Sequence, residues 1–534
     1  MEKLLTKKFT NYFLLIQNGK KISGIIAFLF IIQILSSQNQ IPHLSIISQS
    51  GNYDTQIELK YKAVDPDNIN LEISCHLFDQ LADGSILPHV GATISGDTGH
   101  ILSGEDVRTI QIYFGSTNAE TKATKIILKL SDGESLNPKD ILAQADSQLL
   151  KNHVYALEGM RVRSNSIFFK NSQDYIYSYL SAFHPTRVME QNLNIIPIEN
   201  IECRKSGFSN PQEIICLDAH YDCVSISPGA DDNASGVAAV LEAARILKPY
   251  ACNRSLNYLL FDAEELGLFG SKQYLKLLPK NNTKIKADLN FEMIGFYTEQ
   301  PNTQKLPTGF QQLFPEAYNK VVQNEYRGDF ITNVGNDNSK WLSSKIDSLK
   351  GICVPELNII TINAPGTGSI VPDLRRSDHA SFWDSGIPAV MLTDGANFRN
   401  ENYHTARDSA KFLNYGFMQH VLELSLATLI DLAGFEHASS QEIDIVKTVG
   451  TEELKSSFSA YYSDGLVYVQ SQNSSLAVEA DLYDAQGQKI RNFKVHPEFN
   501  QESKIEVGYL STGIYFLSIY NKNKSRLLKF VVHD

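Results

Sequence analysis

The chain has 534 residues, more than a single hydrophobic core usually organises, so about three domains are expected. Hydrophobic residues make up 43% and charged residues 20% of the sequence, which is typical of a globular protein and excludes a largely disordered one. The formal net charge is −12, and no Lys/Arg cluster with interleaved aromatic residues is present, so nucleic acid is not an expected partner.

Residues 1–38 have the three-part pattern of a secretory signal peptide. Four lysines between positions 7 and 21 precede an apolar run from Ile22 to Leu35, and small polar residues follow it. The alternative is a membrane anchor, but the run is shorter than the ~20 apolar residues of a spanning helix. No other segment of the sequence has that length, so the mature chain is expected to lack a stable membrane span and to be secreted or at the cell surface.

Residues 41–135 alternate between apolar and polar side chains with a period of two. Ile57, Leu59 and Tyr61 share one face of an expected strand, and the same spacing recurs three more times before residue 131. Turn-forming residues separate the runs. Short alternating strands at this spacing predict a β-sandwich of the immunoglobulin or fibronectin type, with no cluster of catalytic residue types.

Residues 140–437 change to strands that alternate with helices. The apolar run at 214–219 suits a buried parallel strand, and apolar residues from Val237 to Leu247 then recur at helical spacing. The pattern predicts an α/β fold with a doubly wound sheet. Residues 455–534 return to alternating strands, which predicts a second small β-sandwich.

Acidic residues and histidines of the middle segment follow the expected strands. In an open α/β sheet, ligands collect at the carboxyl ends of the strands, so these side chains are expected to converge on one crevice. They are His220, Asp222, Glu264, Glu265, Glu292 and His404.

Local patterns support this view, although each has a plainer explanation. The spacing of His220 and Asp222 suits a metal-bound imidazole oriented by a carboxylate, but an isolated pair of this kind is more often an ordinary surface histidine. The GADDNASG segment at 229–236 is typical of a loop and helix cap, yet two acids and an Asn exceed what a cap requires. Glu264 and Glu265 suit a solvated strand end, or a division of roles between a metal ligand and a free base.

Six ordered motifs between His220 and Asp408 resemble the M28 family of co-catalytic zinc aminopeptidases. They are HYD, GADDNASG, FDAEELGLFGS, NFEMIG, SDHASF and NYHT. The resemblance implies a doubly wound mixed sheet of the zinc-peptidase type, flanked in this chain by two β-sandwich domains. It also implies two zinc ions per chain, one held by His220 and Glu292 and the other by Glu265 and His404.

The resemblance places Asp232 as the carboxylate that bridges the two zinc ions, with Asp231 as the fallback. Two His and three carboxylates form the N/O ligand set of a hydrolytic zinc site. Two Zn²⁺ carry four positive charges, three carboxylates cancel three, and a bridging hydroxide cancels the fourth. Glu264, which is not a ligand in this scheme, is expected to take a proton from the water and pass it to the leaving amine.

Five further positions are interpreted. Tyr403 resembles a family tyrosine that donates a hydrogen bond to the developing oxyanion. Asp222 and Asp378 are expected to brace the ligands rather than bind metal. Some relatives have a tyrosine a few residues before the SDH motif, where this chain has Arg375 and Arg376. These arginines either contact a substrate carboxylate or form an ordinary surface pair.

The last 75 or so residues resemble the type A sorting domain of the type IX secretion system. The segments that carry this resemblance are LSTGIYF at 510–516 and KFVV at 529–532. It implies the secretion machinery as a partner, export to the cell surface or beyond, and removal of the domain.

The sequence therefore predicts a secreted aminopeptidase that acts on peptide or protein substrates. A glutaminyl cyclase or a carboxypeptidase on the same scaffold is one alternative, and the intact DDNASG and Glu264-Glu265 motifs argue against the cyclase. The other alternative is a non-catalytic surface adhesin, against which the complete ligand set and the spare Glu264 argue.

Overall fold

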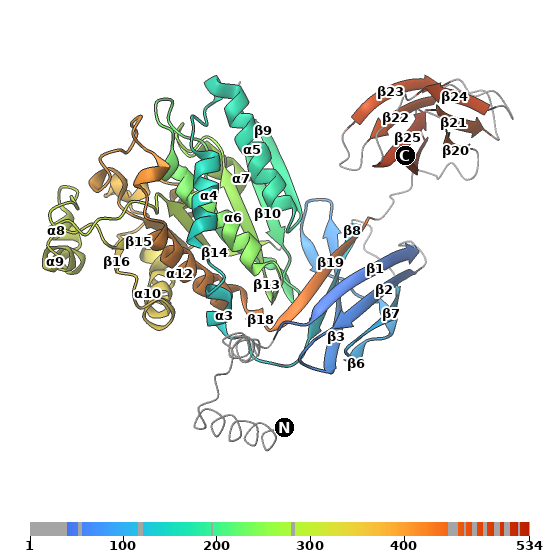
Figure 1. Cartoon of the computed structure of the whole chain (residues 1–534), viewed down its shortest axis with the longest axis horizontal. Coiled ribbons are helices and arrows are strands. Elements are labelled where there is room, and N and C mark those ends of the chain that lie inside the picture. The colour runs from blue at the N-terminus through green and yellow to red at the C-terminus, as the bar shows by residue number, and fades with distance from the viewer. Residues whose placement is uncertain are drawn as a thin grey trace, which may run out of the picture. The chain divides into compact units, whose positions relative to one another are not determined.

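The computed structural model describes the chain from residue 40 onward, apart from several short segments. The described residues are 40–51, 56–115, 121–193, 196–278 and 283–446, and the seven strands β20 to β26 that follow. The predicted signal peptide lies outside the described residues. The chain forms two compact units, Met1–Ile445 and Val446–Asp534, and Figure 1 labels many of their elements.

The N-terminal part of the first unit consists of two β-sheets that share one core. The first sheet has the order β1 (His43–Gly51), β2 (Ile57–Val64), β7 (Gly104–Tyr113) and β5 (Thr93–Gly96). The second has the order β19 (Ala438–Val446), β8 (Thr121–Ser131), β3 (Asn70–Leu81) and β4 (Ile86–Pro88), with β6 (Gly99–Leu102) paired to β3. Side chains of both sheets alternate into a common core, where Ile57, Leu59 and Tyr61 are fully buried. The immunoglobulin or fibronectin type of this region stays a prediction.

Strand β19 joins this N-terminal region from the far end of the first unit. It forms the edge of the second sheet beside β8, and Lys125 of β8 lies 3.1 Å from Glu442 and 2.9 Å from Asp444. The sequence left residues 438–454 without an expected element, because the strand's partner lies about three hundred residues away and local alternation does not reveal it.

An eight-stranded sheet forms the centre of the first unit. Its order is β16 (Ile359–Ala364), β15 (Ile331–Asn336), β17 (Ala389–Thr393), β14 (Lys284–Glu292), β11 (Asn210–His220), β13 (Arg254–Phe261), β10 (Ile196–Lys205) and β9 (Thr186–Leu193). Strand β11 pairs in parallel with β13 and β14, and β14 pairs in parallel with β17. Strands β10 and β15 pair in antiparallel fashion with β13 and β17. The sheet is therefore mixed, with parallel and antiparallel pairs, and the α/β fold built around it confirms the predicted fold class.

Helices cover both faces of this sheet (Figure 1). On β11, Ile215 and Leu217 face a core shared with α3 (Pro138–Leu142), α4 (Ser147–Leu157), α5 (Ser166–Ser181), α6 (Gly236–Leu247), α10 (Lys340–Cys353) and α12 (Tyr415–Ala433). The intervening Ile214 and Cys216 face α7 (Phe269–Leu277) and α11 (His379–Asp384) on the other side. This alternation explains why residues 214–219 of β11 form an apolar-rich run.

Helix α6 packs most closely on the sheet. All of its residues except Arg245 are buried, and five of them are alanines or glycine, which let the helix approach the strands. Shorter elements complete the first unit: α8 (Phe310–Leu313), α9 (Pro315–Gln323), and the pair β12 (Ala251–Cys252) with β18 (Phe435–Glu436). None of the helices in the described part of the chain combines the length and apolar character that a membrane crossing requires.

The second unit contains two antiparallel sheets. One has the order β20 (Phe458–Ser463), β21 (Leu466–Ser471) and β24 (Glu502–Glu506). The other has the order β23 (Lys489–Val495), β22 (Val478–Tyr483), β25 (Gly513–Asn521) and β26 (Lys524–Val532).

Candidate metal centre

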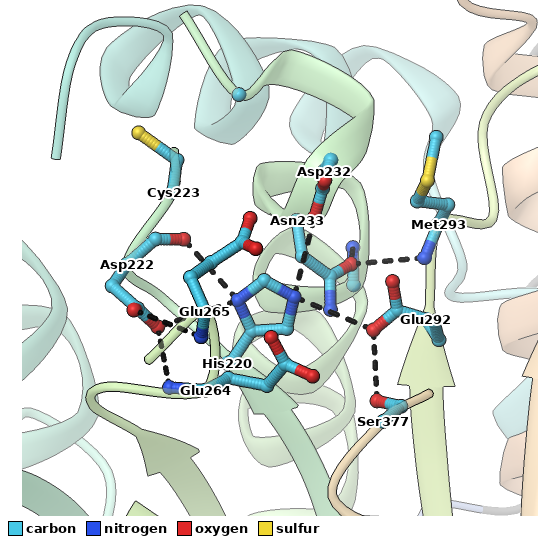
Figure 2. Close-up of polar contacts among 12 residues, drawn as sticks. His220, Asp222, Cys223, Asp232, Asn233, Glu264, Glu265, Glu292, Met293 and Ser377 are labelled. Atoms are coloured by element: carbon cyan, nitrogen blue, oxygen red, sulfur yellow. Dashed lines mark hydrogen bonds and ion pairs between the residues drawn. The ribbon is translucent and has the colours of Figure 1, made fainter. Parts of the chain in front are cut away.

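Three neighbouring parallel strands bring four of the predicted site residues to one edge of the central sheet. His220 is the last residue of β11, and Glu292 is the last residue of β14. Glu264 and Glu265 follow β13, which ends at Phe261. Parallel strands have their carboxyl ends at the same edge, so these side chains converge there, as Figure 2 shows.

Two loops complete the cluster. Asp232 lies in the turn η2 (Ala230–Ser235), which leads into α6. Gly229 precedes this turn with a φ of 62°, and a Cβ added there would lie 2.6 Å from the carbonyl oxygen of Asp232, so the turn requires a glycine. His404 lies in the loop that follows η5 (Ala396–Phe398).

His220, Asp232 and Glu292 form a first group of candidate ligands. Nε2 of His220 lies 3.3 Å from Oδ1 of Asp232 and 3.3 Å from Oε2 of Glu292. All three residues are buried, and one ligand atom from each lies within 4.8 Å of the others. An imidazole nitrogen that faces two carboxylate oxygens is a donor set suited to zinc.

Asp232, Glu265 and His404 form a second group. Nε2 of His404 lies 3.0 Å from Oδ2 of Asp232 and 3.4 Å from Oε2 of Glu265, and the ligand atoms again lie within 4.8 Å of one another. Asp232 belongs to both groups, with one oxygen toward each histidine. The structure thus brings all five predicted ligands together around one shared carboxylate.

The cluster carries an excess of negative charge. Burial, and then the neighbouring Asp232, raise the pKa of the Glu265 carboxyl to about 7. Burial opposes protonation of His404, but hydrogen bonds to Asp232 and Glu265 outweigh it and raise the pKa of this histidine to about 10. The same field that holds protons on these groups attracts divalent cations in their place.

Two buried atoms also fit a metal. Nε2 of His220 and Oε1 of Glu265 are two of the several buried side-chain atoms without a hydrogen-bond partner among the described residues. Buried polar atoms are rarely left in this condition unless something else binds them. Donor type, spacing, charge and these two atoms therefore fit a pair of divalent metal ions.

Glu264 borders the same cleft but belongs to neither ligand group. Burial raises the pKa of its carboxyl well above the ordinary value; His220 opposes the shift and Glu292 adds to it. A carboxyl that borders the cleft without being needed as a ligand is suited to accept and return a proton.

Asp222 connects His220 to the two glutamates (Figure 2). Its Oδ1 lies 3.4 Å from Nδ1 of His220, and its carbonyl oxygen lies 3.2 Å from the same nitrogen. Its carboxylate also accepts the backbone N–H groups of Glu264, at 3.1 Å, and Glu265, at 3.3 Å. These contacts orient the imidazole so that Nε2 faces the ligand group.

The SDH segment, residues 377–379, lies next to the site, and none of its residues belongs to either ligand group. Asp378 is fully buried, and burial raises the pKa of its carboxyl well above the ordinary value. His379 contacts the carbonyl oxygen of Leu374 at 2.9 Å. The hydroxyl of Ser377 donates a hydrogen bond of 2.8 Å to Oε2 of Glu292, a role that the sequence reasoning did not assign to this residue.

Asp231 points away from the two histidines. Its carboxylate accepts hydrogen bonds from the backbone N–H of Gly295, at 2.9 Å, and from Nδ2 of Asn400, at 2.8 Å. The carboxylate of Asp408 accepts the backbone N–H groups of Asp231, at 2.8 Å, and Asp232, at 3.1 Å. Asn400 and Asp408 were missed as site residues, because only the folded chain shows that they hold the loop of Asp232.

Tyr403 lies beside the cluster of candidate metal ligands. Its ring stacks on that of His404 with centroids 3.8 Å apart, and its hydroxyl accepts a hydrogen bond of 2.9 Å from Nη2 of Arg376. Burial raises the pKa of the phenol above its ordinary value, so it keeps its proton near neutral pH.

Two cavities meet at this point. The first cavity, called the metal cleft below, is lined by candidate ligands. Its border includes an acidic cluster and four other side chains. The acidic cluster consists of Asp232, Glu264, Glu265 and Glu292, and the other four are Arg375, Arg376, Tyr403 and His404. The second cavity holds about 730 Å³ of empty space, part of it open to solvent, and shares Glu292, Arg376 and Tyr403 with the first. Its walls are mainly apolar, with side chains that include Leu306, Phe310, Phe330, Val334, Ile360, Ile362 and Met391.

Comparisons with known proteins identify the family of the segment that carries these residues. The profile of Peptidase family M28 matches residues 201–358 and 364–429, which include all five candidate ligands and Glu264. The uncharacterized protein YfbL of Escherichia coli (strain K12) is 32% identical over 250 residues, which cover 44% of this chain and 72% of that protein. The chain belongs to peptidase family M28. It is a zinc metallopeptidase of this family.

Other relatives match over less of their own length. Aminopeptidase YwaD of Bacillus subtilis (strain 168) is 28% identical over 60% of this M28 chain and 59% of its own length. LapB from Legionella pneumophila is a solved structure with 19% identity and a TM-score of 0.43, covering 55% of this chain and 74% of that one. The Secretion system C-terminal sorting domain matches residues 463–533, which marks the M28 peptidase as a secreted or cell-surface protein.

Proposed function

We propose that this M28 peptidase is a two-zinc aminopeptidase that removes N-terminal residues from peptides. The observation that carries the proposal is the shared position of Asp232 between His220 and His404. His220 and Glu292 would hold one zinc ion and Glu265 and His404 the other, with Asp232 between them. When bound, zinc would supply Lewis acidity toward a water molecule and the scissile carbonyl.

Glu264 is the proposed general base. It borders the cleft and is not needed as a ligand, so it can take a proton from the attacking water and deliver it to the leaving amine. Tyr403 would donate a hydrogen bond from its hydroxyl to the developing oxyanion, a role that its position beside His404 supports. The hydrogen bond that it accepts from Arg376 strengthens it as a donor.

The surroundings of the cluster favour a substrate with a free N-terminus. An N-terminal ammonium is attracted by the acids of the cleft, and the adjoining apolar cavity offers room for the side chain of the N-terminal residue. The two cavities meet at Glu292 and Tyr403, beside the proposed position of the scissile bond.

The sorting domain suggests the route of the protein. We propose that the type IX secretion machinery exports the chain by means of residues 463–533 and that this domain is then removed. The N-terminal β-rich region contributes none of the residues of the proposed site.

Hydrolysis of defined peptides by the zinc-loaded, purified protein tests the proposed function. Leu-Leu-NH2 should be cleaved, whereas N-acetyl-Leu-Leu should not, and a chelator should abolish cleavage in a way that zinc reverses. Glu264→Gln should lower kcat by roughly 10²–10⁴-fold and leave the zinc content unchanged. Cleavage of the acetylated peptide would instead favour a carboxypeptidase, and cyclisation of N-terminal Gln without hydrolysis would favour a cyclase.

A further inference from the structure

Two adjacent arginines border the metal cleft, and their surroundings differ. The guanidinium of Arg375 makes a two-pronged ion pair with Asp384, at 2.8 and 2.7 Å, and also contacts the carbonyl oxygen of Thr367. Its charge is therefore compensated inside the protein. A pair of this kind fixes the local loop and leaves little of the arginine for a ligand.

Arg376 is only weakly compensated. Its Nη1 donates to Oδ1 of Asn397 and its Nη2 to the hydroxyl of Tyr403, both at 2.9 Å, and both acceptors are neutral. The carboxylate of Asp373 is 3.6 Å away, and both of these side chains are nearly half exposed. A guanidinium has five N–H groups, so several remain for another acceptor.

The position of Arg376 allows its remaining N–H groups to contact a substrate. It borders both the metal cleft and the apolar cavity, so it stands beside the place where the proposed function puts the scissile bond. Glu264 borders the same cleft outside the proposed ligand set and would repel a substrate carboxylate, unless a cation receives it. The N-terminal ammonium of a substrate needs no such cation.

Resting on the proposed aminopeptidase function, we propose that Arg376 binds a substrate carboxylate on the leaving-group side of the scissile bond. This group is either the α-carboxylate of a dipeptide or the side chain of an acidic second residue. The acidic cluster then holds the ammonium end of the substrate and Arg376 holds its carboxylate. The enzyme would thus favour short peptides or peptides with Asp or Glu at the second position.

Matched peptides test this assignment. The substrates are Leu-Leu against Leu-Leu-NH2, and Leu-Asp-NH2 against Leu-Asn-NH2, so that each pair differs mainly by one negative charge. Wild-type enzyme should show a kcat/KM at least about 10-fold higher for the charged member of one pair, as expected of a charge-assisted hydrogen bond. The first pair identifies the α-carboxylate, and the second identifies the acidic side chain.

Substitution of the arginine separates binding from general damage. Arg376→Gln should bring the ratio within the favoured pair close to one, mainly through KM, and Arg376→Lys should keep part of it. Arg375→Gln, in the same wall of the cleft, should leave the ratio close to that of the wild-type enzyme, whatever it does to absolute rates.

Two results would overturn the inference. One is a wild-type ratio near one in both pairs; the other is an Arg376→Gln enzyme that is slower on every peptide with its ratio unchanged, which would make Arg376 only a support for Tyr403. If wild-type enzyme cleaves none of the four peptides, the proposed function itself fails, and this inference fails with it.

Discussion

Two buried ionic clusters in the first unit differ in how their charge is balanced. Glu242 of α6 is fully buried, and its carboxylate accepts hydrogen bonds from Tyr179 at 2.8 Å and from Arg245 at 2.7 Å, with His153 at 3.2 Å. Burial opposes ionisation of Glu242, but these partners outweigh it and lower its pKa to about 2. The protein itself supplies every countercharge that this cluster needs.

The cluster at the strand ends lacks such balance. Burial and neighbouring acids raise the pKa of Glu265 to about 7, and two histidines serve three carboxylates. Of the two arginines in the cleft wall, Arg375 is paired with Asp384. Arg376 contacts Tyr403 rather than an acid of the cluster. A balanced cluster of this kind holds the helix layer together, whereas the unbalanced cluster at the strand ends is suited to bind cations from solution.

The largest effect is expected from the shared carboxylate. Asp232→Asn should remove a ligand from both metal groups and lower kcat/KM by roughly a thousandfold or more. Its neighbour is the matched control: Asp231→Asn should lower the unfolding midpoint while keeping kcat/KM within about tenfold, because the carboxylate of Asp231 accepts hydrogen bonds from Gly295 and Asn400 and belongs to neither ligand group. Equal losses of activity and metal in both variants would remove the distinction between these acids.

A smaller effect is expected at Asp222, which contacts His220 but belongs to neither ligand group. Asp222→Asn should weaken zinc binding or activity by roughly 10–100-fold, because the imidazole loses its orienting carboxylate. Zinc titration against a fluorescent chelator measures the affinity. An unchanged affinity and an unchanged kcat would show that the backbone carbonyl of Asp222 alone orients the ring.

The smallest effect on activity is expected in the balanced cluster. Glu242→Gln should leave kcat/KM nearly unchanged but lower the unfolding midpoint at pH 7 by roughly a few degrees. The folded pKa of Glu242 is depressed, so its stabilisation is present above the ordinary value of 4.5 and is lost as the pH falls toward 2. The gap between the two unfolding midpoints should therefore narrow below pH 4.5. A gap that widens on acidification would contradict this sign.

Much of the central sheet was predictable because its strands are buried on both faces. Ile214 to Ala219 is an apolar-rich run that only Asp218 interrupts, and the structure places it in the middle of the sheet. Strand β19 was not predictable, because its pairing with β8 joins the two ends of the first unit. Local sequence carries no signal for such a distant partner.

The candidate site divides in the same way. The acids and histidines at strand ends could be named from motif order, and the structure brings them together; their metal binding stays a prediction. Ser377, Asn400 and Asp408 could not be given roles, because each acts through hydrogen bonds to a segment distant in sequence. Of these, only Ser377 had a signal, since it begins the SDHASF motif.

Zinc content per chain tests the central claim most directly. The purified wild-type protein, loaded with zinc and freed of excess metal, should contain two zinc ions per chain by elemental analysis. A content of one or none would contradict the account, because Asp232 would then have no pair of ions to join.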